Sequence, residues 1–147
     1  RAQEIGPGVR FAEPPVLAWS ADGKRVAASV GTRGWDEERG GPTERASIEV
    51  YDATTNTWVA TTMSRARTGH SATLLGSGQV IVCGGAEGLL SAATAIDAVA
   101  RFDAATNTWV DLAPLTQPRA GHSAALLPDG HLLLLGGGTT SGEAMHF

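Results

Sequence analysis

The sequence contains a single cysteine, Cys83, and a single tyrosine, Tyr51, among its 147 residues. One cysteine cannot form an intrachain disulfide, so cysteine content leaves the redox compartment open. No apolar run approaches the roughly 20 residues of a membrane-spanning helix, and helical periodicity is absent. The formal net charge is −4, and no basic stripe could follow a phosphate backbone. We therefore expect no membrane span and no nucleic-acid partner.

Glycine is abundant: it accounts for 19 of the 147 residues, well above its usual share of about 7%. Frequent glycine between short apolar runs predicts many strands joined by tight turns. The chain starts at Arg1 and shows no signal peptide. We expect either a targeting segment that has been removed or a piece of a longer chain.

Two blocks of sequence repeat in the same order. Arg67–Gly85 aligns with Arg119–Gly137 at an offset of 52, with 10 identities in 19 positions. Tyr51–Val59 aligns with Phe102–Val110 at an offset of 51, with 7 identities in 9 positions. A fainter third copy, Val16–Val30, lies upstream. The chain is therefore built from a repeat of about 50 residues.

Each repeat is expected to contain four strands. In the last copy, His122–Leu127 and His131–Leu135 flank an Asp-Gly turn, a strong hairpin signal because glycine accepts positive φ. The uninterrupted leucines of His131–Leu135 predict a strand buried on both faces. In the preceding copy we expect the third strand at Ala98–Phe102, then a tight turn and a fourth strand from Trp109.

This arrangement resembles the kelch repeat. The resemblance lies in an Arg-x-Gly-His-Ser strand, a strand ending in Gly-Gly, a strand ending in an aromatic residue and Asp, and a Thr-Trp strand. The period agrees with the roughly 50 residues of kelch repeats. It implies an all-β fold of kelch-type β-propeller blades, each of four antiparallel strands. The sequence is also similar to the propeller region of galactose-oxidase-like bacterial proteins, which implies an extracytoplasmic or secreted bacterial protein.

About three blades are predicted. We expect blade 1, a degenerate copy, at residues 14–62, blade 2 at 63–115 and three strands of blade 3 at 119–147. Gly8–Ala12 is expected to supply the missing outer strand of blade 3. Propellers close with about four to eight blades, so this is an incomplete ring with an apolar flank. The remaining blades are expected from other polypeptide or from a second copy in a homodimer.

Several residues recur at equivalent places in successive repeats. Recurrence distributes a residue around the ring instead of gathering it at one site. Hydrogen bonding within each blade is therefore favoured over metal ligation or general-base catalysis, and the tryptophans are expected to pack between blades. These structural repeat residues are Arg67, His70, Arg119, His122, Trp58 and Trp109. Cys83 aligns with Leu135 and is predicted to be a small buried hydrophobe.

The resemblance to galactose oxidase raises the question of a copper site. That family uses tyrosine and histidine ligands, with one tyrosine linked to a cysteine. Here Tyr51 aligns with Phe102 and precedes Asp52, so no copper ligand can be transferred. No Ser-His-Asp spacing, phosphate-binding glycine motif or zinc-type cluster is present either. We predict no catalytic residue, cofactor or metal in this chain.

The connections between second and third strands, Gly31–Ala46 and Ala86–Ala95, are long. In a four-strand meander these connections share one face with the fourth-to-first connections, which makes that face the candidate binding surface. An aromatic among mixed charges is typical of a protein hot spot, and a mobile solvated loop is the alternative. The candidate partner-binding residues are Arg33, Trp35, Asp36, Glu37, Glu38, Arg39 and Arg45. Leu89 and Leu90 are expected to fold back onto blade 2.

A non-catalytic protein-binding or scaffolding propeller module is the function that these observations favour. The hypothesis depends on the kelch resemblance, the one-sided long connections and the lack of a catalytic set. One alternative is a propeller segment of a secreted carbohydrate-active oxidase or lectin-like protein, with its catalytic residues in other blades. Another is a structural subunit of a larger assembly.

Overall fold

A computed structural model describes residues 10–11, 16–19, 23–36, 41–63, 65–88, 93–138 and 143–146. Every regular element in this part of the chain is a β-strand, and every pairing is antiparallel. None of the described residues belongs to a helix that could cross a membrane. The strands are β1 (Arg10–Phe11), β2 (Val16–Trp19), β3 (Arg25–Asp36), β4 (Gly41–Asp52), β5 (Thr57–Thr62), β6 (Ser71–Leu74), β7 (Gln79–Cys83), β8 (Ala86–Glu87), β9 (Thr94–Ala95), β10 (Val99–Asp103), β11 (Thr108–Leu112), β12 (His122–Leu126), β13 (His131–Gly136) and β14 (Glu143–His146).

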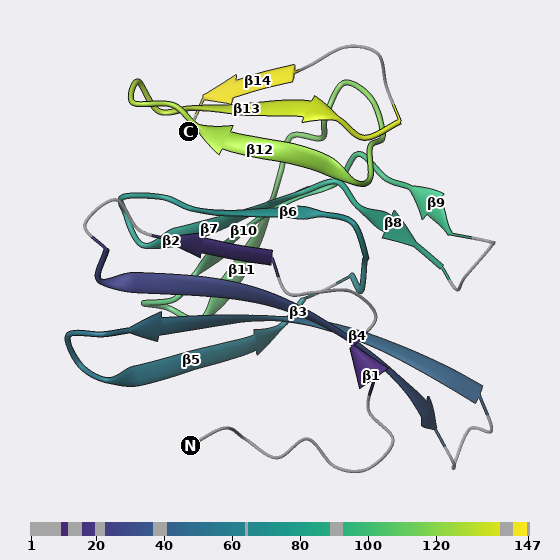
Figure 1. Cartoon of the computed structure of the whole chain (residues 1–147), viewed down its shortest axis with the longest axis horizontal. Coiled ribbons are helices and arrows are strands. Elements are labelled where there is room, and N and C mark those ends of the chain that lie inside the picture. Colours follow the sequence, from purple (N-terminus) through teal and green to yellow (C-terminus); the bar gives the residue numbers. More distant parts are fainter. Residues whose placement is uncertain are drawn as a thin grey trace.

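Three sheets stack one against the next, and each corresponds to one sequence repeat (Figure 1). Blade 1 contains β2, β3, β4 and β5 in that order, with β1 added beside β3. Blade 2 has the order β6, β7, β10, β11, and blade 3 has the order β12, β13, β14. The predicted all-β class and the meander of four antiparallel strands are thus confirmed. The three blades do not close a ring.

The first strands of the blades lie next to one another. β6 of blade 2 contacts β2 of blade 1 and β12 of blade 3, and each of the three is an edge strand of its own sheet. The later strands of each blade lie further out. This arrangement is that of propeller blades, whose first strands line the axis of the ring.

Matching tight turns join the third and fourth strands of blades 1 and 2. In each turn an aspartate, Asp52 or Asp103, accepts through Oδ1 a 2.9 Å hydrogen bond from the amide two residues further on. Each turn ends on an asparagine with positive φ, 53° at Asn56 and 54° at Asn107. Aspartate caps such turns and asparagine tolerates this backbone conformation. The repeated Asp-to-Asn segment therefore encodes the same turn twice.

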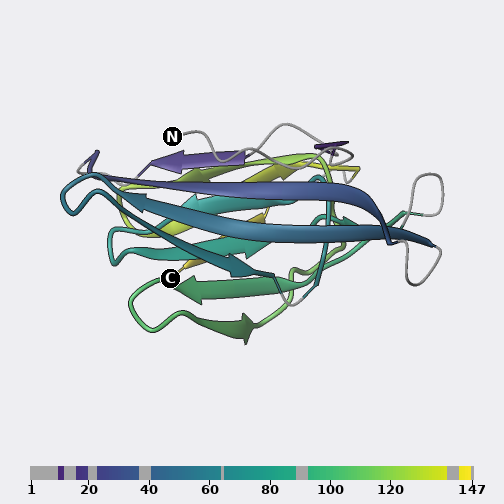
Figure 2. The ribbon, with the colours of Figure 1, turned by 90° about the horizontal axis from the view of Figure 1, so that it is seen from below.

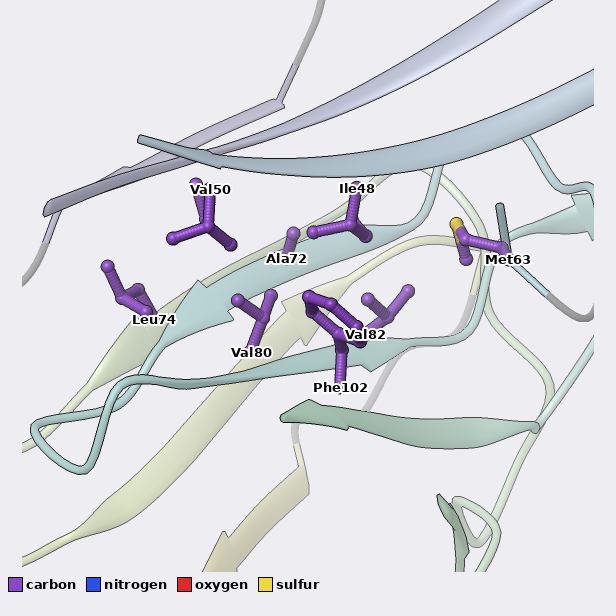
Figure 3. Packing of buried hydrophobic residues seen from close by; sticks show 9 residues of the cluster. Ile48, Val50, Met63, Ala72, Leu74, Val80, Val82 and Phe102 are labelled. Atoms are coloured by element: carbon purple, nitrogen blue, oxygen red, sulfur yellow. The ribbon is translucent and has the colours of Figure 1, made fainter. Parts of the chain in front are cut away.

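Apolar side chains fill both spaces between successive blades. Between blades 1 and 2, β4 presents Ile48 and Val50 to Val80, Val82 and Phe102 of blade 2 (Figure 3). The second cluster, between blades 2 and 3, consists of Ile81, Cys83, Val99, Leu115, Leu132 and Leu134. Full burial of such a side chain contributes about 1.5–3 kcal/mol. These two layers hold the stack together.

Two expectations differ from the observed fold. Arg10–Phe11, the described part of Gly8–Ala12, pairs with β3 in blade 1 and not with β14 of blade 3. β13 is buried on one face only: Leu132 and Leu134 are fully buried, whereas Leu135 is 52% exposed. The leucine run predicted two covered faces, but β13 lies in the last of the stacked sheets, where only one face meets another blade.

Candidate interaction surface

The first long connection is mostly a β-ribbon and not the predicted loop. β3 and β4 continue their pairing outward from Gly31↔Ala46 to Asp36↔Gly41. Glycine and charged residues are loop signals in a sequence, and the segment Gly31–Ala46 is rich in both and contains one proline, Pro42. Antiparallel pairing that has begun in the blade needs no apolar side chains to continue into solvent, so composition did not reveal it.

Four of the candidate partner-binding residues lie in this ribbon. Arg33, Trp35 and Asp36 belong to β3, and Arg45 belongs to β4. The register places Trp35 opposite Pro42 and Arg33 opposite Glu44. The other three candidates, Glu37, Glu38 and Arg39, lie outside the described residues. β1 pairs with the same part of β3, because Arg10 lies opposite Arg33, so the ribbon has three strands at its base.

A second, shorter ribbon follows the second strand of blade 2. β8 and β9 pair through Ala86↔Ala95 and Glu87↔Thr94, and Leu89 and Leu90 lie outside the described residues. Figures 1 and 2 both show the two ribbons projecting from the same end of the stack, opposite the tight turns. The structure thus concentrates its long connections at one end, which we call the ribbon end.

Contacts at the ribbon end tie the second ribbon to the segment that enters blade 2. Arg65 and Glu87 form a two-pronged ion pair, with Nε 2.5 Å from Oε1 and Nη2 donating to Oε2 at 2.7 Å. Thr68 and Ala86 exchange backbone hydrogen bonds of 3.0 and 2.8 Å. The two side chains are 50% and 30% exposed, so the ion pair contributes little to stability.

The repeat arginines lie inside the fold. Arg67 is 3% exposed and donates from Nη1 to the carbonyls of Gly84, at 3.2 Å, and Ala98, at 3.1 Å. Arg119 is 1% exposed and donates from Nη1 to the carbonyl of Gly136 at 3.0 Å. Burial lowers the pKa of Arg67 from its ordinary value. Both guanidinium groups bind the end of the second strand in their own blade, where a ligand from solvent does not reach them.

The repeat histidines are also buried, and one of them joins two blades. His122 Nε2 lies 2.8 Å from Ser71 Oγ, which links the first strand of blade 3 to that of blade 2. Burial lowers the pKa of His122, and the charge of Arg119 lowers it further. His70 is 7% exposed. Among the described residues, no three His, Cys, Asp or Glu side chains gather in a group that could hold a metal ion.

The two repeat tryptophans differ in their surroundings. Trp109 of β11 packs against the first apolar cluster, and its Nε1 donates to Thr61 Oγ1 of blade 1 at 3.3 Å. Trp58 of β5 occupies the equivalent place in blade 1 but is 62% exposed. Cys83 is fully buried in the second apolar cluster. Packing between blades is thus observed for Trp109 and not for Trp58 in this chain.

A hollow of about 550 Å³ lies between blades 2 and 3. Its lining includes Leu75, Gln79, Arg101, Leu112 and Leu126. Gln79 is already bonded, because its amide donates to Asp103 Oδ2 at 3.0 Å. The lining residues include one hydroxyl, that of Ser77, but no histidine, cysteine or carboxylate, so the hollow has no general base beside this hydroxyl.

A scan against models of known protein families finds no match. A search of curated proteins finds Kelch-like protein 35 of Mus musculus, which is 33% identical over 105 residues. The aligned part covers 70% of this chain but 17% of the mouse protein, so the chain spans a small part of its relative's length. Together with the stacked antiparallel sheets, this similarity supports a kelch-type fold, here as partial propeller blades and not as a closed ring.

Proposed function

We propose that the chain is a non-catalytic protein-binding module that meets its partner at the ribbon end. The observation that carries the proposal is the projection of both ribbons from this one end (Figure 2). The similarity to a kelch-like protein supports a protein-interaction propeller in general. Long connections on a rigid scaffold are where such folds carry their binding residues.

The polar residues of the repeat motif do not form an alternative binding site. Arg67, Arg119 and His122 are buried and bonded inside the fold. Binding must therefore use other residues, and the first ribbon supplies an aromatic residue among mixed charges. The proposed contact residues of the connection Gly31–Ala46 are Arg33, Trp35, Asp36, Glu37, Glu38, Arg39 and Arg45. Within the described residues, no observation favours an oxidase, a lectin or a purely structural subunit over this function.

The test uses peptides selected from a phage-displayed random library on the purified chain. Their dissociation constants are then measured with the unchanged chain, with Trp35→Ala and with Leu127→Ala. A hot-spot tryptophan contributes about 2 kcal/mol or more, so we expect Trp35→Ala to weaken binding about 30-fold or more. Leu127→Ala is the control, because it removes an exposed large apolar side chain that lies outside the ribbons.

We expect the control to bind selected peptides as the unchanged chain does. Failure to select any peptide, or equal binding by the Trp35→Ala variant, would exclude the ribbon end as the binding surface. Selected peptides that respond to Leu127→Ala and not to Trp35→Ala would also contradict the proposal.

A further inference from the structure

Equivalent faces of two blades can be compared row by row, because the strand register aligns one residue from each strand. In blade 2, Leu74 lies opposite Val80, Val80 opposite Phe102, and Phe102 opposite Trp109. This row faces blade 1, where Leu74, Val80 and Phe102 are at most 2% exposed. The row is thus the surface through which a blade packs on the preceding one (Figure 3).

Blade 1 carries the same row with nothing in the described chain to cover it. Trp19 lies opposite Val26, Val26 opposite Tyr51, and Tyr51 opposite Trp58. Trp19 is 65% exposed and Trp58 is 62% exposed. We call Trp19, Val26, Tyr51 and Trp58 the aromatic row. Its large exposed apolar groups mark an interaction surface.

The aromatic row already has the geometry of its buried counterpart. The ring centroids of Tyr51 and Trp58 are 4.9 Å apart with planes at 38°. Those of Phe102 and Trp109 are 5.2 Å apart with planes at 35°. The rings of blade 1 are therefore arranged as those that pack against another blade, and little rearrangement would be needed to dock one.

The chain also carries a surface against which the aromatic row could pack, on the exposed face of blade 3. Blade 2 turns Ile81 and Cys83 towards blade 3, and both are fully buried. Blade 3 has Leu133 and Leu135 at the equivalent places, because Ser123 pairs with Leu135 as Ser71 pairs with Cys83. Leu135 is 52% exposed. Each copy thus exposes both halves of a blade-to-blade contact, one on blade 1 and one on blade 3.

We infer that a second copy of this chain covers the aromatic row. Blade 1 of each copy packs on the exposed face of blade 3 in the other copy, so that two three-blade halves form one six-blade ring with twofold symmetry. Both contacts of the ring are then identical and no apolar flank is left open. Six blades lie within the range in which propellers close. The inference does not depend on the ribbon end, which is a different surface.

One residue on the same face of blade 1 opposes this contact. Glu49 lies beside the aromatic row, opposite Ala28 and Ala60. The equivalent position in blade 2 is Ala100, which is 1% exposed against blade 1. Covering a carboxylate without a cationic partner weakens association. Replacement of Glu49 by the alanine found in blade 2 should therefore tighten the dimer.

The test is the mass in solution, measured by light scattering after size-exclusion chromatography over a dilution series. We expect a species of twice the 15.1 kDa of the chain. Trp58→Glu and Leu135→Asp, one on each face, should each weaken association about 30-fold or more. Glu49→Ala should strengthen it, and Trp35→Glu in the ribbon should leave it unchanged. Circular dichroism checks that each variant retains its β-structure.

Mixing the two weakened variants distinguishes this arrangement from other dimers. A mixture of Trp58→Glu and Leu135→Asp contains one undamaged contact per pair, so it should form dimers at concentrations where neither variant does alone. A monomer at every concentration, a dimer that survives both substitutions, or no rescue on mixing would each overturn the inference. Loss of the dimer on Trp35→Glu would also overturn the inference. That result would not decide whether the ribbon end binds a partner, which the peptide experiment tests independently.

Discussion

At the scale of single residues, equivalent side chains in successive blades differ mainly in what covers them. Phe102 and Tyr51 stack on their tryptophans in the same way, yet only Phe102 is fully buried. Cys83 is fully buried, whereas its counterpart Leu135 is half exposed. The local sequence sets the position of each side chain in its strand, and the neighbouring blade determines how far it is buried.

His122 is the residue whose burial gives a measurable pH dependence. Its pKa is lowered from the ordinary value of 6.5 by burial and by Arg119. The unfolded chain therefore takes up this proton at higher pH than the folded chain does. His122 favours folding above about pH 6.5, and this contribution is lost as the pH falls through the folded-state pKa. We predict that the urea midpoint of unfolding falls between pH 8 and pH 5.

The variant His122→Gln identifies the source of that fall. Glutamine keeps a polar group near Ser71 but does not take up a proton in this range. We expect a smaller decrease of the urea midpoint on acidification than in the unchanged chain, as followed by circular dichroism. The same decrease in both proteins would show that His122 is not the responsible group.

At the scale of elements, the ends of the second strands of blades 2 and 3 are tightly constrained by neighbouring backbone. Gly84 has a φ of +56°, and a Cβ there would overlap the carbonyl of Arg119 and approach the His122 ring. Gly85 donates its amide to the carbonyl of Arg119 at 2.8 Å. The paired glycines therefore allow the next blade to approach closely, which explains why Gly-Gly recurs with the repeat.

Gly84→Ala tests this constraint. An alanine at positive φ costs about 1–2 kcal/mol, and contact with an immobile carbonyl adds about 1–3 kcal/mol. We expect the free energy of unfolding in urea to fall by the sum of the two costs, about 2–5 kcal/mol. Gly23→Ala is the matched control, because Gly23 also has a positive φ, +68°, and no atom lies within 4 Å of a Cβ there. Equal effects at the two glycines would mean that close approach of the blades does not require Gly84.

Most strands could be predicted from the sequence, and the ribbons could not. Asp-Gly turns, the Asp-to-Asn segment and the Gly-Gly ends are local signals, and they located the strands of blades 2 and 3 closely. The ribbon from Gly31 to Asp36 carries loop-type residues, and its strand pairing depends on the blade from which it extends. Register beyond a blade is set by tertiary structure, which local composition does not encode.

At the scale of the whole molecule, three blades leave two exposed flanks that match the buried contacts between them. The sequence predicted three blades and an open ring, because the repeat can be counted. It could not identify the exposed row, since Trp58 and Trp109 lie in almost identical sequence segments. The difference between 62% exposure of Trp58 and the packed position of Trp109 is visible only when the blades are stacked.

The most direct measurement is 19F NMR of the chain labelled with 5-fluorotryptophan, recorded with a soluble paramagnetic quencher over a range of protein concentrations. Resonances are assigned by replacing each tryptophan with phenylalanine. If a second copy covers the aromatic row, Trp19 and Trp58 are quenched at low concentration and protected at high concentration, while Trp109 is protected throughout. Trp19 and Trp58 that stay open to the quencher at every concentration would contradict the account.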